Sequence, residues 1–88
     1  GCGNGKFLKE VSKFIPSVVG IDLVRSPLIT EEGYKFYQRN IITEELDFKS
    51  DLLVSADVME HFKESDIPAI IEKFTKISDK QMHIIACY

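Results

Sequence analysis

The sequence has no tryptophan, only two cysteines among its 88 residues, and no cluster of basic side chains. Cys2 and Cys87 are too few for a disulfide framework, and neither they nor the two histidines complete a spaced metal-ligand motif. We therefore expect no metal site. Sparse cysteine also favours a reducing compartment, so we expect a cytoplasmic protein.

Long apolar runs are also absent, and none approaches the roughly 20 residues that a membrane-spanning helix requires. No segment resembles a signal peptide. The net charge is -3, and between Glu31 and Asp66 ten residues are acidic and four are basic. Because a nucleic-acid interface needs lysine and arginine clustered on one surface, the sequence predicts neither a nucleic acid nor a membrane as partner.

Glycine is scarce except at the start, where Gly1-Cys2-Gly3-Asn4-Gly5 contains three of the five. Because glycine has no Cβ atom, such a loop lets the backbone approach a ligand, and a helix after it offers free N–H groups to a carboxylate or phosphate. A loop of this kind normally leaves a buried strand, and neither a strand nor an initiator methionine precedes Gly1. We therefore expect the chain to be the interior of a longer protein.

A helix and a strand are predicted directly after this loop. Apolar residues recur at helical spacing from Phe7 to Ile15, and the pattern ends at Pro16. The run from Val18 to Ile21 is almost wholly apolar and ends in Asp22. Such a run is typical of a strand buried on both faces of a parallel sheet.

The next segment gives conflicting signals. Residues 25–33 predict a short helix or a loop. Residues 34–38 are aromatic and alternating and predict a strand, with a continuous helix from Thr30 to Arg39 as the alternative.

The second half predicts two strands with a helix between them. After a polar loop over residues 44–50, residues 52–54 predict a buried strand running towards Ser55 and Ala56, and residues 82–87 predict another. The helix between these strands has an apolar face made of Ile67, Ile70, Ile71, Phe74 and Ile77.

Ser65 or Asp66 is the expected cap of this helix. The alternation of strands and helices predicts an α/β fold, with a doubly wound, mostly parallel sheet covered by helices on both faces. One domain over residues 1–88 is expected.

Polar groups that follow strands are the candidates for function, because ligands of open α/β sheets bind beyond the carboxyl ends of the strands. Three such groups are the glycine loop, Asp22 and Asn40. Asp22 lies 19 residues after Gly3, close to the spacing of about 20 at which an acidic residue binds a ribose in nucleotide-binding folds. The pattern therefore predicts a nucleoside cofactor.

The loop reads G-x-G-x-G, and Lys6 stands where a dinucleotide fingerprint would place its third glycine. Together with this loop, Gly20-Ile21-Asp22, residues 36–41 (F-Y-Q-R-N-I) and residues 55–62 (S-A-D-V-M-E-H-F) resemble the ordered motifs of class I S-adenosylmethionine-dependent methyltransferases. The resemblance covers essentially the whole chain. The family's first strand and last two strands have no counterpart, so it implies a partial methyltransferase domain, the cofactor-binding half.

The resemblance implies S-adenosyl-L-methionine as cofactor and a small-molecule methyl acceptor. The glycine loop, residues 1–5, would then contact the methionine part of the cofactor. The other contacts implied are Asp22 with Leu23 at the ribose, Asn40 with Ile41 at the adenine, and Ser55, Ala56 and Asp57 near the methionine ammonium and sulfonium. If the acceptor must lose a proton, His61, with Glu60 beside it, is the candidate general base. A structural role is the alternative for His61.

Two other functions stay open. A NAD(P)-dependent oxidoreductase domain would keep the loop and Asp22 but leave residues 55–62 unexplained. A truncated, non-catalytic binding or interaction module would account for the missing strands. The first strand would lie between the strands ending at Asp22 and near Ser55, so its absence exposes two strand edges, through which we expect the chain to self-associate.

Overall fold

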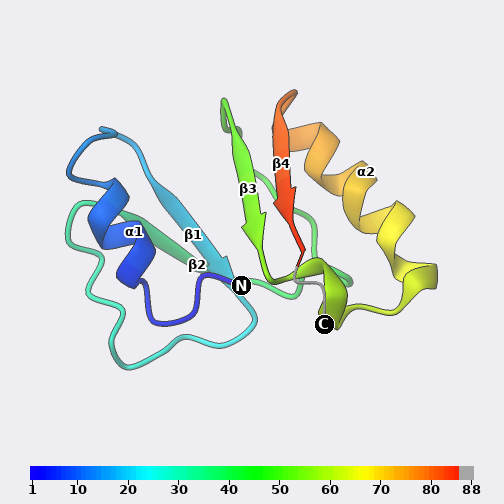
Figure 1. The fold of residues 1–88 in the computed structure, drawn as a ribbon, viewed down its shortest axis with the longest axis horizontal. Coiled ribbons are helices and arrows are strands. Elements are labelled where there is room, and N and C mark those ends of the chain that lie inside the picture. Colours follow the sequence, from blue (N-terminus) through cyan, green and yellow to red (C-terminus); the bar gives the residue numbers. More distant parts are fainter. Residues whose placement is uncertain (86–88) are drawn as a thin grey trace. The chain divides into compact units, whose positions relative to one another are not determined.

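The computed structural model describes residues 1–85 (Figure 1). The chain divides into two compact units, Gly1–Asn40 and Ile41–Tyr88, and each is described by itself.

The first unit pairs two parallel strands beside a short helix (Figure 1). Its elements are helix α1 (Lys6–Val11), strand β1 (Val19–Asp22) and strand β2 (Lys35–Gln38). Gly20 lies opposite Phe36 in the register of the two strands. The two strands predicted here are confirmed. Residues 25–33 form a loop, and the alternative of a continuous helix over residues 30–39 is wrong.

The core of the first unit consists of Leu8, Ile29, Tyr34 and Phe36, with Cys2 and Val18 packed against it. Gly20 allows helix and loop to approach β1 closely: a Cβ atom there would collide with Leu8 Cδ1 and lie 3.1 Å from Cys2 Sγ. The prediction that this strand is buried on both faces is wrong, because Val19 is 38% exposed and only Gly20 is fully buried. Within this unit, Leu8 and Cys2 pack against β1 at Gly20.

Helix α1 ends at Val11 rather than at Ile15. The Ser12 hydroxyl donates a hydrogen bond to the Lys9 carbonyl (2.7 Å), and the chain continues as a turn. Of the predicted apolar face only Leu8 is buried, whereas Phe14 is 86% exposed. The helical spacing of apolar residues continues beyond the end of α1, but these later residues have no packing partner in this unit. The sequence pattern therefore predicted a helix that is too long.

The second unit is a strand, helix, strand unit with two short 3₁₀ turns before the helix (Figure 1). Its elements are strand β3 (Leu53–Ala56), the turns Met59–His61 and Glu64–Asp66, helix α2 (Ile67–Ile77) and strand β4 (Gln81–Ile84). β3 and β4 are parallel, with Ser55 opposite His83. The predicted last strand is confirmed as far as Ile84, and its predicted end at Cys87 lies outside the described residues.

Helix α2 covers one face of the β3–β4 sheet with the apolar side chains that its periodicity predicted. Ile70, Phe74 and Ile77 are at most 5% exposed. The Phe74 ring stacks on the His83 ring, with centroids 5.8 Å apart. Burial of this face supplies most of the stability of an 11-residue helix, which is marginal on its own in water.

The predicted side-chain cap of α2 is wrong. Asp66 occupies the capping position, but its carboxylate makes no capping hydrogen bond, and Ser65 lies within the preceding 3₁₀ turn. A capping residue has extended backbone angles. Asp66 has φ -88° and ψ -18°, so its backbone is already helical.

The two faces of the β3–β4 sheet differ in polarity, and the more polar face is the one that packs against α2. The face towards α2 carries Leu53, Ser55, Gln81 and His83, which are buried or half-buried, and three of these four residues are polar. The opposite face carries Val54, Met82 and Ile84, which are 45%, 51% and 53% exposed. The apolar face of this sheet is therefore the one left open within the unit.

The described residues form a small α/β structure with two parallel, two-stranded sheets and two α-helices. Within residues 1–85, no helix has the length and apolar character needed to cross a membrane.

Candidate functional site

The glycine loop lies against the carboxyl end of β1 and is joined to it by hydrogen bonds. The Gly3 N–H donates to Asp22 Oδ2 (2.8 Å). The Gly1 nitrogen and the Cys2 N–H both donate to the Ile21 carbonyl, over 2.6 and 3.1 Å. The structure therefore brings together the glycine loop and Asp22, which the sequence predicted as one site.

Asp22 is held in its ionised form. Its Oδ1 accepts a hydrogen bond from the Leu23 N–H (2.7 Å), and its Oδ2 accepts the one from Gly3. Partial burial opposes ionisation and would raise the pKa of Asp22. The hydrogen bond from the Gly3 N–H, the positive charge of the Gly1 nitrogen 3.8 Å from Oδ2, and the hydrogen bonds from the Val24 and Leu23 N–H groups together outweigh burial, so the pKa lies below its ordinary value. Asp22 therefore both fastens the loop and provides a negative charge at the strand end.

The same carboxylate retains the capacity to bind a ligand. A carboxylate has about four acceptor positions, and its two strong partners are the N–H groups of Gly3 and Leu23. The Asp22 side chain is 23% exposed. The Val24 N–H lies 3.5 Å from Oδ1 and the Gly1 nitrogen lies 3.8 Å from Oδ2, so their contacts are long and both oxygens keep acceptor capacity for a ligand.

The two glycines of the loop that have positive φ have different roles. Gly3 has φ +59° and no atom within 4 Å of the place where a Cβ would stand, so it borders open space. Gly5 has φ +80°, and a Cβ there would lie 2.7 Å from Tyr34 Oη and 2.9 Å from Ile29 Cδ1. Gly5 is thus required for packing onto the core, and Gly3 is the position that leaves room for a ligand.

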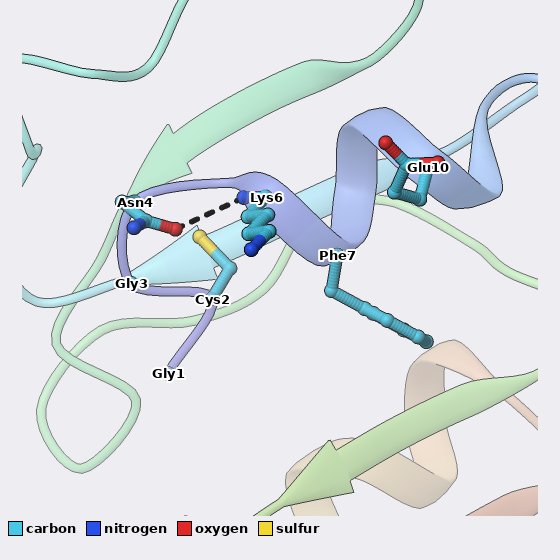
Figure 2. Close-up of a pocket in the computed structure, with 7 residues that line it drawn as sticks. All are labelled: Gly1, Cys2, Gly3, Asn4, Lys6, Phe7 and Glu10. Carbon is cyan, nitrogen blue, oxygen red and sulfur yellow. Dashed lines mark hydrogen bonds between the residues drawn. The ribbon is translucent and has the colours of Figure 1, made fainter.

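A pocket of about 610 Å³ opens beside the loop (Figure 2). Its lining consists of Gly1, Cys2, Gly3, Asn4, Lys6, Phe7 and Glu10. The Asn4 side chain accepts a hydrogen bond from the Lys6 N–H (3.0 Å), which is drawn as a dashed line in Figure 2. This bond occupies one of the N–H donors that the start of α1 was expected to offer to a ligand. The volume is within the range of small-molecule sites.

Three of the lining residues were not predicted from the sequence: Lys6, Phe7 and Glu10. Phe7 and Glu10 are three residues apart on α1, so they project from the same side of the helix as neighbours. That spacing is visible in the sequence. From this spacing, both residues could have been identified as lining residues of the pocket beside the loop.

Cys2 is half-buried between the loop and β1. Burial raises the pKa of its thiol above the ordinary value, because the charged form is poorly solvated there. A thiol in this state is a poor nucleophile at neutral pH. Cys2 therefore contributes its backbone and its small volume to the site.

Leu23 and Asn40, the other predicted contacts of the first unit, follow its two strands. Leu23 is 58% exposed, and its carbonyl accepts a hydrogen bond from the Gln38 side chain (3.2 Å). Asn40 is half-buried after β2. Because β1 and β2 are parallel, these residues lie at the same end of the sheet as Asp22.

Ile41, Ser55, Ala56 and Asp57 belong to the second unit. The Ser55 hydroxyl is buried and lies 2.6 Å from His83 Nδ1. Asp57 has φ +55° directly after β3, a backbone conformation that costs energy for a residue other than glycine, and its N–H donates to the Ile84 carbonyl (2.8 Å).

His61, the candidate general base, ends the first 3₁₀ turn of the second unit. Its side chain is 73% exposed, and its Nε2 lies 4.0 Å from Glu60 Oε1. This distance is too long for a hydrogen bond. Within residues 1–85 no carboxylate lies within hydrogen-bond distance of the imidazole, so His61 is an exposed histidine without the described partner that a base usually has.

Among residues 1–85, no group of three or more histidine, cysteine, aspartate or glutamate side chains could hold a metal ion. Comparisons with models of protein families, with curated proteins and with solved structures find no match to this chain.

Proposed function

We propose that this chain is the cofactor-binding part of an S-adenosylmethionine-dependent methyltransferase that acts on a small-molecule acceptor. The observation that carries the proposal is the hydrogen bond between the Gly3 N–H and Asp22 Oδ2, beside a pocket of about 610 Å³. This bond fixes a ribose-binding carboxylate next to a loop whose open side can receive the rest of a nucleoside.

Asp22 does not line the pocket itself but lies beside it, bonded to the loop, and the chemistry of the loop and this carboxylate together suits the cofactor. An ionised Asp22 accepts hydrogen bonds from both ribose hydroxyls, and the loop backbone receives the methionine part without interference from a Cβ at Gly3. Methyl transfer from a sulfonium is an in-line displacement that depends on positioning and exclusion of water rather than on a catalytic triad. His61 is the proposed base for an acceptor that must lose a proton.

The proposal includes a single doubly wound sheet to which both strand pairs belong. Its support is that every strand pair in residues 1–85 is parallel and that β3 and β4 carry an open apolar face. Parallel sheets are normally covered on both faces. Cytoplasmic location is part of the same proposal and is supported by the low cysteine content.

Calorimetric titration with S-adenosylhomocysteine and with NADH tests the cofactor. We expect saturable binding of S-adenosylhomocysteine, weakened about tenfold or more in Asp22→Asn, because a hydrogen bond to a charged group contributes about 1.5–3 kcal/mol. Asp79→Asn, in an exposed loop, is the matched control and should bind as the wild type does. NADH binding alone would instead indicate an oxidoreductase, and binding of neither ligand would favour an interaction module.

A second titration separates ribose binding from a general loosening of the loop. We compare 5′-methylthioadenosine with its 2′-deoxy analogue, in the wild type and in Asp22→Asn. If Asp22 binds the ribose, loss of the hydroxyl weakens binding by the wild type but has little effect in the variant. An equal loss in both proteins contradicts the assignment of Asp22.

A further inference from the structure

Lys6 carries a charge in the pocket beside the glycine loop that no described residue binds. Its side chain is exposed and lines the pocket of about 610 Å³, and Figure 2 shows it at the start of α1, next to the loop. Within residues 1–85, the Lys6 ammonium forms neither a hydrogen bond nor an ion pair. Because the side chain is exposed, a ligand in the pocket can reach this ammonium.

The other charged groups in the wall of this pocket are already paired. The Glu10 carboxylate accepts hydrogen bonds from the Lys13 ammonium over 3.2 and 3.1 Å. The Gly1 nitrogen donates to the Ile21 carbonyl (2.6 Å) and lies 3.8 Å from Asp22 Oδ2. Among the described residues that line the pocket, the Lys6 ammonium is therefore the charged group that is free to pair with a ligand, and its partner must be an anion.

The stability of α1 does not account for a lysine at this position. Lys6 is the first residue of this six-residue helix, whose first turn contains no acidic residue. The N-terminal end of a helix carries partial positive charge, so a lysine there is unfavourable and an acidic residue is favourable. The Lys6 N–H is already bonded to Asn4 Oδ1 (3.0 Å), so the side chain is the group that remains available.

A single carboxylate is the anion that this wall suits. An ammonium on a flexible four-carbon stem pairs with a carboxylate as a point charge and does not require a fixed orientation. One free cation with the Glu10 carboxylate in the same wall suits a singly charged anion better than a diphosphate. The proposed cofactor carries one carboxylate, on the methionine part that the loop is expected to contact.

We propose that Lys6 binds the carboxylate of the methionine part of the cofactor and makes the pocket selective for nucleosides that carry this group. The inference rests on the proposed function and adds to it a residue that distinguishes S-adenosylmethionine from other adenosine derivatives. Lys6 and the rest of the pocket lining lie wholly in the first unit.

Two ligands that differ only in the carboxylate test this assignment. S-adenosylhomocysteine carries it, and 5′-S-(3-aminopropyl)-5′-thioadenosine has the same chain with the ammonium but without the carboxylate. In calorimetric titrations of the wild type, we expect S-adenosylhomocysteine to bind about fivefold more tightly, which is the difference that one exposed ion pair provides. Equal affinities for the two ligands overturn the proposal.

Three variants show whether Lys6 causes this preference. Lys6→Met removes the ammonium, so it should weaken binding of S-adenosylhomocysteine about fivefold and leave binding of the aminopropyl compound unchanged. Lys6→Arg keeps the positive charge and should retain the preference. Lys9→Met removes an equal charge from an exposed position of the same helix outside the pocket lining, and is the matched control. A preference that persists in Lys6→Met, or that Lys9→Met abolishes equally, contradicts the role of Lys6.

Two further ligands identify the anion that Lys6 contacts. 5′-S-(3-carboxypropyl)-5′-thioadenosine keeps the carboxylate and lacks the ammonium, and Lys6→Met should weaken its binding by the same factor as that of S-adenosylhomocysteine. ADP carries a diphosphate in place of the methionine part. If Lys6→Met weakens binding of ADP but not of S-adenosylhomocysteine, Lys6 is assigned to a phosphate and the proposal is overturned.

Failure of this inference and failure of the proposed function give different results. If the wild type binds S-adenosylhomocysteine and the aminopropyl compound equally, and Asp22→Asn weakens both, the cofactor site stands without a role for Lys6. If the wild type binds neither compound, the proposed function fails and the inference fails with it.

Thermal unfolding without ligand separates binding from a structural role of Lys6. Lys6→Met should melt at the same temperature as the wild type or higher, because it removes a cation from the positive end of α1. A lower melting temperature would show that Lys6 stabilises the fold and would contradict the argument that a ligand accounts for it.

Discussion

Replacing Asp22 with alanine removes the carboxylate that joins the glycine loop to the end of β1. Two short hydrogen bonds disappear, from the Gly3 N–H (2.8 Å) and from the Leu23 N–H (2.7 Å). Hydrogen bonds to a charged group contribute about 1.5–3 kcal/mol each where they are buried. The side chain is 23% exposed, so water replaces part of each bond, and we expect a total loss of about 1–2 kcal/mol.

Thermal unfolding followed by circular dichroism measures this loss. For a chain of this size, about 1–2 kcal/mol corresponds to a fall in Tm of about 5–15 °C. Asp22→Asn keeps one acceptor oxygen and should lose about half as much. Asp79→Ala, in an exposed loop, is the control. Amide hydrogen exchange at Gly3 should accelerate in Asp22→Ala before exchange in the rest of the unit does.

The pH dependence follows from the lowered pKa of Asp22. A carboxylate whose folded pKa is below its unfolded value of about 3.9 contributes its full stability above that value and loses it as the pH falls through the folded pKa. The difference in Tm between wild type and Asp22→Asn should therefore shrink below about pH 4. A difference that persists unchanged at low pH, or an Asp22→Ala variant as stable as the wild type, refutes the account of Asp22 as an ionised clamp.

The remaining predictions concern one residue each. Gly5→Ala should cost about 2–4 kcal/mol of unfolding free energy in denaturant titration, because its φ of +80° disfavours a side chain and the new Cβ would lie 2.7 Å from Tyr34 Oη. Lys73→Met should lower the free energy of unfolding by about 1–3 kcal/mol in the same assay, because the Lys73 ammonium donates to three carbonyls in residues 41–44 over 2.8–3.1 Å. An unchanged denaturation midpoint would contradict this. Met82→Glu should reduce self-association measured by multi-angle light scattering, because it places a charge on the open apolar face of the β3–β4 sheet. A wild-type protein that is monomeric at high concentration would contradict the premise that this face drives self-association.

Local pattern and packing agree in one of two elements that the sequence predicted well. Ile70, Phe74 and Ile77 recur at helical spacing and are the buried residues of α2. The apolar run ending at Asp22 is likewise a strand. In α2 the residues that set the period are also the residues that are buried, whereas the run ending at Asp22 forms a strand although only Gly20 in that strand is buried.

The end of α1 and the cap of α2 could not be predicted from residue type. The end of α1 depends on packing partners, and the cap of α2 depends on backbone angles. Phe14 continues the helical pattern but has no surface to pack against in its unit. Asp66 is a common capping residue, yet the 3₁₀ turn before it already fixes helical backbone angles. Capping requires an extended backbone that no sequence pattern reports.

For the candidate site, the spacing of 19 residues predicted that the glycine loop and Asp22 belong to one site, whereas the hydrogen bond from the Gly3 N–H to Asp22 was not predicted. The lack of a partner for the Lys6 ammonium within residues 1–85 was invisible in the sequence, because the pairing of a charged group depends on its distances to residues elsewhere in the chain.

All strand pairing in residues 1–85 is parallel, and this governs how the chain folds. A hairpin pairs neighbouring residues early, but here Val19 must find Lys35, and Leu53 must find Gln81, before any sheet hydrogen bond forms. Loop closure therefore precedes every gain from the sheets, which slows folding relative to a helical chain of equal length. Helix α2 is marginal on its own and is stabilised by packing on the β3–β4 sheet, so it does not remove this requirement. Because the chain between paired residues is shorter from Val19 to Lys35 than from Leu53 to Gln81, the second unit should be the slower of the two to fold.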